Sequence, residues 1–177
     1  MPMKKILLTL TVTCIWTIGL PCTCKVEGNF LKMSKNVDLV AVVEVTGYGD
    51  SIVVDLGDKD FPTVQRPETI IFNVVKIIKG SDDRKELRVF GDDGQLCRPS
   101  IRDFTIGKYH VIGLYKCKNN KRISGVLETP DYYSISICGQ YSINYSPTEK
   151  IVSGVINKKK KVTTMTLDEL EILLKED

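Results

Sequence analysis

Hydrophobic residues in this chain fall mostly into short runs, rich in β-branched side chains and separated by glycine, proline and charged residues. The first such run after residue 30 is 39–45, which only Ala41 and Glu44 interrupt. Runs of this composition are typical of buried β-strands. We therefore predict a strand there, a hairpin extension at 52–54, and further strands at 70–78, 87–89, 109–115, 123–127, 141–145, 151–156 and 162–165.

The connection between the first two strands is expected to be long. It contains five residues that commonly interrupt regular structure: Gly47, Gly49, Gly57, Pro62 and Pro67. Glycine and proline are the strongest local markers of turns and loops. The segment 91–103 is also predicted to be a loop.

Alternation is clearest at 133–138, where Tyr133, Ile135 and Ile137 occupy every second position. Successive side chains of a strand point to opposite faces, so these three residues should face the core. Cys138 is then expected to point away from the core.

The chain is predicted to end in a helix. Thr166 and Glu169 have the spacing of a capping box, and Leu167, Leu170, Leu173 and Leu174 form one apolar stripe. No strand is followed by an amphipathic crossover helix, so the pattern favours a small, mainly β barrel or sandwich over a βαβ fold. At 177 residues the chain fits one domain.

The first residues have the pattern of a secretory signal. Lys4 and Lys5 precede an apolar run at 6–20 that several threonines interrupt. The run is too short for a transmembrane helix, which needs about 20 apolar residues. We predict a signal peptide within 1–21, cleaved after residue 19 or 21, followed by one domain at 22–177. The protein is thus expected to be secreted, or to lie in the periplasm or cell envelope of a bacterium.

Charge gives little indication of a nucleic-acid partner. The leader holds two of the 25 basic residues and none of the 22 acidic ones, so the rest of the chain is nearly neutral. The one dense basic cluster is Lys158, Lys159, Lys160 and Lys161. It is a candidate polyanion patch, although no aromatic residues lie among the lysines to stack bases, and a solvated hairpin tip is the plainer interpretation.

Catalytic motifs are scarce, and the chain is predicted not to be an enzyme and to carry no cofactor of its own. Its single histidine, His110, lies inside an apolar strand, where a structural role is expected. Asp92 and Asp93 lack the spacing of a calcium loop and are interpreted as part of a turn.

Cysteine usage is informative once export is assumed, because small exported domains are commonly stabilised by disulfides. Five cysteines follow the leader: Cys22, Cys24, Cys97, Cys117 and Cys138. An odd number leaves one thiol over. The pair Cys22 and Cys24 could be a redox pair, half of a metal site, or the ends of two disulfides; the missing helical context and the isolation of the other cysteines favour the third interpretation.

Three features together suggest a family. They are the Cys22-Thr23-Cys24 opening, the residues Asp38, Leu39 and Val40 at the start of the first strand, and the lysine and glycine turn that ends the second strand at 75–80. Cys97 and Cys138 then follow at matching places. Across most of 22–174 the chain resembles the N-terminal inhibitory domain of the tissue inhibitors of metalloproteinases, within the netrin-like group.

The resemblance implies an OB-fold-like closed barrel with Cys22 bonded to Cys97 and Cys24 bonded to Cys138. It also implies a mechanism, in which the α-amine and carbonyl of Cys22 chelate the catalytic zinc of a target metalloendopeptidase. The side chain of Thr23 would then enter the specificity pocket. This requires Cys22 to be the mature N-terminus. Cys117 has no counterpart in the family and is a candidate for a disulfide between two copies.

The second functional hypothesis is a non-inhibitory extracellular or envelope module that binds a glycan, polyanion or protein through the barrel surface.

Overall fold

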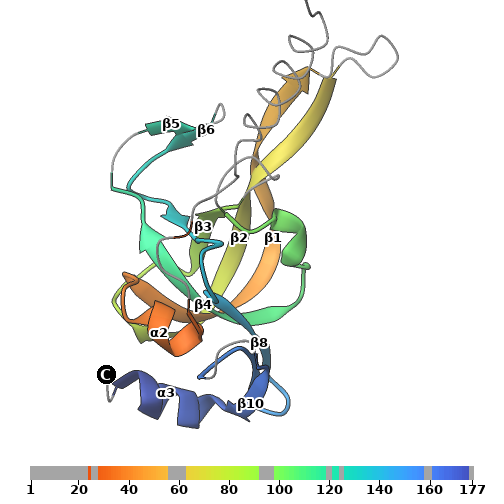
Figure 1. The fold of residues 1–177 in the computed structure, drawn as a ribbon. Helices are drawn as coiled ribbons and strands as arrows, with labels where there is room; N and C mark the ends of the chain where they lie inside the picture. Colours follow the sequence, from red (N-terminus) through yellow and green to blue (C-terminus); the bar gives the residue numbers. More distant parts are fainter. Residues whose placement is uncertain are drawn as a thin grey trace, which may run out of the picture.

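The computed structural model describes residue 24 and residues 28–55, 63–91, 98–118, 121–123, 126–157 and 161–175. In this part of the chain the protein is mainly β, with a closed five-stranded barrel and a short C-terminal helix (Figure 1). This confirms the predicted fold class. The barrel consists of β1 (Leu39–Asp55), β2 (Thr63–Lys79), β3 (Glu86–Phe90), β4 (Tyr109–Lys116) and β7 (Tyr133–Ser134).

Pairing of β1 with β4 closes the barrel. The strand order is β1-β2-β3-β7-β4, and the two end strands pair antiparallel from Leu39 opposite Leu114 to Glu44 opposite Tyr109. Strands β3 and β7 are parallel, whereas the other barrel pairs are antiparallel. This arrangement is that of an OB-fold, a five-stranded Greek-key barrel.

Strand β1 pairs with two neighbouring strands, β2 and β4, and its sequence explains how. Its residues 39–43 are all at most 1% exposed, so both faces of the strand are covered. A run that is apolar at every position suits such a strand. Register shifts relative to β2 occur at 40–41, 42–43 and 45–47. Bulges of this kind bend a strand and increase its twist, which lets β1 curve from β2 round to β4.

Further strands extend the sheet beyond β4, and short elements surround it. Strand β8 pairs with β4, β9 with β8, and β10 with β9, whereas β5 and β6 form a separate hairpin. The bounds are β5 (Lys121–Ile123), β6 (Val126–Glu128), β8 (Ser142–Ser146), β9 (Ile151–Gly154), β10 (Thr163–Thr166), α2 (Phe30–Ser34), the 3-10 helix η2 (Ile101–Asp103) and α3 (Leu167–Lys175). The long β1–β2 hairpin projects from the barrel on the side away from α3 (Figure 1).

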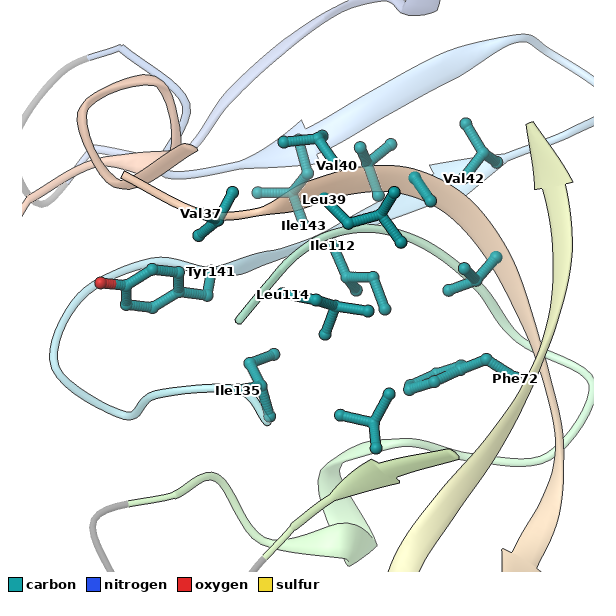
Figure 2. Close-up of a cluster of buried hydrophobic side chains, with 14 of the residues drawn as sticks. Val37, Leu39, Val40, Val42, Phe72, Ile112, Leu114, Ile135, Tyr141 and Ile143 are labelled. Atoms are coloured by element: carbon teal, nitrogen blue, oxygen red, sulfur yellow. The ribbon is translucent and has the colours of Figure 1, made fainter. Parts of the chain in front are cut away.

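The core joins residues from most of these elements. Figure 2 shows Leu39 of β1, Phe72 of β2 and Ile112 and Leu114 of β4 gathered in one cluster, all fully buried. The Phe72 ring meets Phe104 edge to face at 5.6 Å between centroids. Burying side chains of this size contributes about 1.5 to 3 kcal/mol each, which identifies this cluster as the main source of stability.

The predicted long connection between the first two strands was wrong at several positions. Gly47 and Gly49 lie inside β1, and Pro67 lies inside β2 opposite Ser51. Proline lacks the N–H that a second neighbouring strand would need. Its position is tolerated because β3 pairs with β2 only from Thr69 onward. Gly57 and Pro62 lie outside the described residues.

Two other strand predictions need correction. Tyr133 and Ile135 are buried as expected, but Ile137 is 51% exposed, because β7 already ends at Ser134 and the alternation does not continue. The single strand predicted at 123–127 is instead a pair of short strands, β5 and β6.

Both described α-helices begin with side-chain caps. The capping box at α3 is confirmed, since the Thr166 N–H donates to Glu169 Oε2 at 2.7 Å and the Glu169 N–H donates to Thr166 Oγ1 at 3.2 Å. Leu167 and Leu170 are buried, as the apolar stripe predicts. Helix α2 was not predicted; Asn29 caps it by accepting from the Lys32 N–H at 2.9 Å. Five residues are too few to show helical periodicity.

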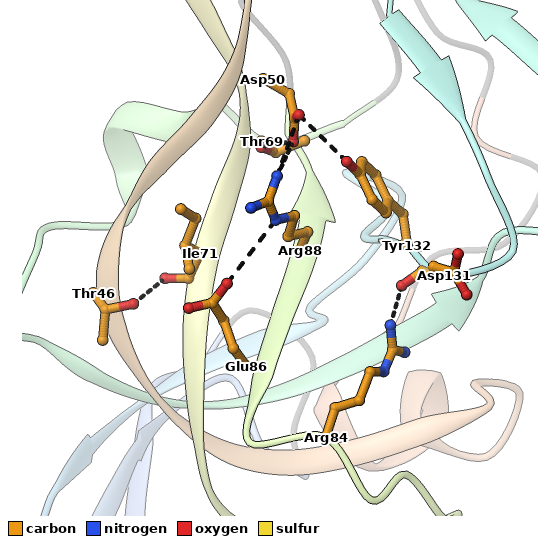
Figure 3. A network of polar contacts seen from close by, with 9 residues as sticks. All are labelled: Thr46, Asp50, Thr69, Ile71, Arg84, Glu86, Arg88, Asp131 and Tyr132. Atoms are coloured by element: carbon orange, nitrogen blue, oxygen red, sulfur yellow. Dashed lines mark hydrogen bonds and ion pairs between the residues drawn. The ribbon is translucent and has the colours of Figure 1, made fainter.

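A charged cluster holds the β2–β3 turn against the start of β7. The Asp82 carboxylate accepts from Arg84 Nη2 at 2.7 Å, from Arg84 Nε at 2.9 Å and from the Tyr133 hydroxyl at 2.8 Å. Arg84 also donates to the carbonyl of Asp131 (Figure 3). Hydrogen bonds from Arg84 hold the pKa of Asp82 well below its usual range, and burial together with the bond to Asp82 raises the pKa of Tyr133 to about 12.

We predict that Asp82→Asn lowers the free energy of unfolding at pH 7 by about 1.5 to 3 kcal/mol, the range for hydrogen bonds to a charged group. Because folding depresses the pKa of Asp82, its contribution is complete above about pH 4 and declines as the pH falls further. The difference between wild type and variant should therefore shrink in acid. Urea unfolding at neutral and acidic pH measures it.

Asp83→Asn is the matched control, since its side chain is exposed and adjacent in sequence. It should leave stability unchanged. Equal stability of Asp82→Asn and wild type at pH 7 would show that the cluster contributes nothing to folding.

Candidate functional site

The predicted functional segment is attached to the barrel by a disulfide between Cys24 and Cys138. The two Cα atoms lie 5.2 Å apart, and 114 positions separate the cysteines in the sequence. This confirms the pairing that the family resemblance implied for these two residues. Cys22, Thr23 and Cys97 lie outside the described residues, so the pairing of Cys22 with Cys97 stays a prediction.

Cys138 lies in a tight loop that follows β7. Its N–H donates to Ser136 Oγ at 3.0 Å, and the Gly139 N–H donates to the Ile137 carbonyl at 2.9 Å. Gly139 has a φ of +120°, and a Cβ there would lie 2.5 Å from Met33 Sδ. A side chain at 139 would therefore be strained and would collide with the Met33 side chain of α2. Gly139 thus lets this loop lie close to Met33 and Gly28.

Backbone hydrogen bonds hold the residues that follow. The Gln140 N–H donates to the Gly28 carbonyl at 3.0 Å, and the Phe30 and Leu31 N–H groups donate to the carbonyls of Val155 and Ile156. Phe30 is fully buried. The segment 28–31 is thus fixed to the loop after β7 and to the end of β9, while Cys24 is fixed covalently to the same loop.

A cavity of about 280 Å³ lies beside this loop. Residues of η2, β4, β8, β9 and the loop after β7 line it. Among them are His110 and Ser142, which face each other with His110 Nδ1 3.3 Å from Ser142 Oγ. Sequence reasoning missed the cavity, because its lining comes from four separate stretches of the chain and no local motif connects them.

His110 lies on β4, inside a strand as predicted, and only 7% of it is exposed. Its ring meets Phe104 at 5.3 Å between centroids, and its Nε2 has no hydrogen-bond partner among the described residues. Burial lowers the pKa of His110, which favours the neutral imidazole. A serine and histidine alone do not make a hydrolytic triad, which needs a third group to orient the imidazole. That the chain is not an enzyme stays a prediction.

The other candidate residues lie apart from this site or outside the described residues. Lys161 is exposed, whereas 158–160 and Asp92 and Asp93 are not described. Cys117 is buried at 7% exposure and is not disulfide-bonded. A disulfide between two copies through Cys117 would first require this thiol to become accessible.

In the part of the chain that the structure describes, no group of three or more histidine, cysteine or acidic residues could hold a metal ion. No helix among those residues has both the length and the apolar character needed to cross a membrane. No family model matches the sequence, and no curated protein matches it significantly.

We predict that the double variant Cys24→Ser, Cys138→Ser loosens the leading segment first. The disulfide closes a loop of about 115 residues, for which chain entropy gives at most about 5 kcal/mol, so unfolding should become easier by about 2 to 5 kcal/mol. Amide hydrogen exchange should accelerate most at Phe30, Leu31 and Gln140, whose hydrogen bonds join this segment to the barrel.

The control is Cys117→Ala, which removes a cysteine without breaking this bridge. It should leave exchange at Phe30, Leu31 and Gln140 slow relative to global unfolding. Unchanged exchange at those three amides in the double variant would mean that the disulfide does not anchor the segment.

Proposed function

We propose that the chain is an exported protein that inhibits zinc metalloendopeptidases through its leading Cys22-Thr23-Cys24 segment. The observation that carries this proposal is the disulfide from Cys24 to Cys138. It attaches the Cys-x-Cys motif covalently to an OB-fold-like barrel, at the position that the resemblance to the metalloproteinase inhibitors implies.

The chemistry uses an open position on the metal. Catalytic zinc in proteases is held by three protein ligands and keeps a fourth position for water or substrate. The α-amine and carbonyl oxygen of Cys22 would take that position as a chelating pair and displace the water. The zinc belongs to the target, and the inhibitor supplies only backbone donors. Thr23, between the two cysteines, would present its side chain to the specificity pocket.

Rigidity explains why such a segment would inhibit the protease and resist cleavage. A peptide that is ordered before binding loses little conformational entropy on docking. Here the residue after Thr23 is covalently bonded to the barrel, and 28–31 are fixed by backbone hydrogen bonds on two sides. A predicted second bridge from Cys22 to Cys97 would restrain the motif at its other end, so that a cleaved segment could not diffuse away.

Export is part of the proposal, because disulfides persist outside the reducing cytosol. The partner is then an extracellular or envelope zinc endopeptidase. The proposal needs a free amine on Cys22, which makes the site of leader cleavage decisive. Cleavage after residue 19 would leave Leu20 and Pro21 attached and would block chelation.

We predict that oxidised protein beginning at Cys22 inhibits one or more members of a zinc endopeptidase panel with one-to-one stoichiometry. Adding a single alanine before Cys22 should weaken inhibition by about 100-fold or more, equivalent to about 3 kcal/mol, because the amine is no longer placed to bind zinc. Titration of protease activity with each form gives the affinities. Mass spectrometry of the exported protein identifies the natural N-terminus.

Comparing the form that begins at Cys22 with the alanine-extended form separates a loss of zinc chelation from a loss of folding. The alanine-extended form should match the parent in thermal unfolding, so its loss of inhibition can be assigned to the amine. The proposal fails if the form beginning at Cys22 inhibits no member of the panel, or if both forms inhibit equally.

A further inference from the structure

The cavity beside the loop after β7 contains a buried, incompletely satisfied histidine, and this is the most informative feature outside the Cys-x-Cys segment. His110 Nδ1 lies 3.3 Å from Ser142 Oγ, whereas Nε2 is buried without a hydrogen-bond partner in the described structure. Leaving a buried polar atom without a hydrogen bond is energetically costly, and a group left in this state in a folded protein often marks a functional site.

The strand register places further polar side chains next to His110. His110 on β4 is directly opposite Asn144 on β8, and Asn144 is directly opposite Ser153 on β9. Residues that pair directly across strands point to the same face of a sheet. His110, Asn144 and Ser153 therefore form a polar row across three strands, and all three line the cavity.

The remaining lining combines neutral polar groups with apolar surface. Ser136 and Gln140 of the loop after β7 add hydroxyl and amide groups, while Phe104, Ile135 and Tyr141 add apolar area. No lysine or arginine is among the described residues that line the cavity, and Asp103 contributes one carboxylate. This charge distribution disfavours an anionic ligand.

Strand pairing argues against an extended peptide as the ligand. Peptides that bind to sheets usually add to a free strand edge. Both edges of β8 are paired, with β4 and β9, and both edges of β9 are paired, with β8 and β10. A ligand in the cavity is therefore recognised mainly by side chains, which suits a compact molecule with many hydroxyl groups.

We propose that this cavity binds one neutral sugar residue, with Asn144 and Ser153 bonding its hydroxyl groups beside the His110 ring and the apolar lining contacting the sugar ring. A volume of about 280 Å³ lies at the lower end of the range for small-molecule pockets and matches a single ring better than a chain. The proposal does not depend on protease inhibition.

The test uses the only histidine in the chain as its reporter. Imidazole signals of labelled, unmutated protein belong to His110 without further assignment. The probes are the methyl glycosides of glucose, galactose, mannose and N-acetylglucosamine, together with glucuronate and a capped alanine-serine-alanine tripeptide. At least one neutral glycoside should shift the His110 signals saturably with a millimolar dissociation constant, while glucuronate and the tripeptide bind more weakly.

Asn144→Ala should weaken that binding about 3- to 10-fold, as expected for loss of one hydrogen bond. Asn73→Ala is the matched control, an exposed strand asparagine on β2 outside the cavity, and should leave binding unchanged. The proposal is overturned if no neutral glycoside shifts the His110 signals at concentrations up to about 50 mM, which is far above a millimolar dissociation constant. It is equally overturned if only glucuronate or the tripeptide binds, or if Asn144→Ala binds as tightly as wild type.

Discussion

Closure of the sheet through β1 and β4 is the constraint on which the rest of this structure depends. Residues 40–44 pair with β2 along one edge and with β4 along the other, so this largely apolar segment has a strand on each side. Closure also forces β7 into the gap between β3 and β4. Only two residues of β7 pair there, and the chain must then leave the barrel wall at residue 135.

The loop that begins at this point brings together both proposed sites. Cys138 receives Cys24, Gly139 lets the loop lie close to Gly28, and Gln140 binds Gly28. The same loop forms one wall of the cavity that contains His110. A short final barrel strand therefore decides the position of this loop, since a longer β7 would have kept these residues in the sheet.

Much of the fold could be predicted from the sequence, because buried strands and capped helices carry local signals. The run 39–45, the strand at 109–115 and the Thr166 capping box were all identified from neighbouring residues, and all are present. Local signals failed where a neighbouring strand decided the outcome. Gly47 and Pro67 look like loop residues, yet pairing across the hairpin keeps both in strands, and Ile137 is exposed because β7 ends early.

For the site, the sequence by itself determined which residues could carry chemistry: the Cys22 and Cys24 motif, the single histidine and the remaining cysteines. Resemblance to a known family supplied the pairing of Cys24 with Cys138, which spacing alone left open. Only the tertiary structure decided that His110 shares a cavity with Ser142, Asn144 and Ser153. The reason is physical, because strand register and barrel closure join residues that are distant in the sequence, and neither is encoded by the residues next to His110.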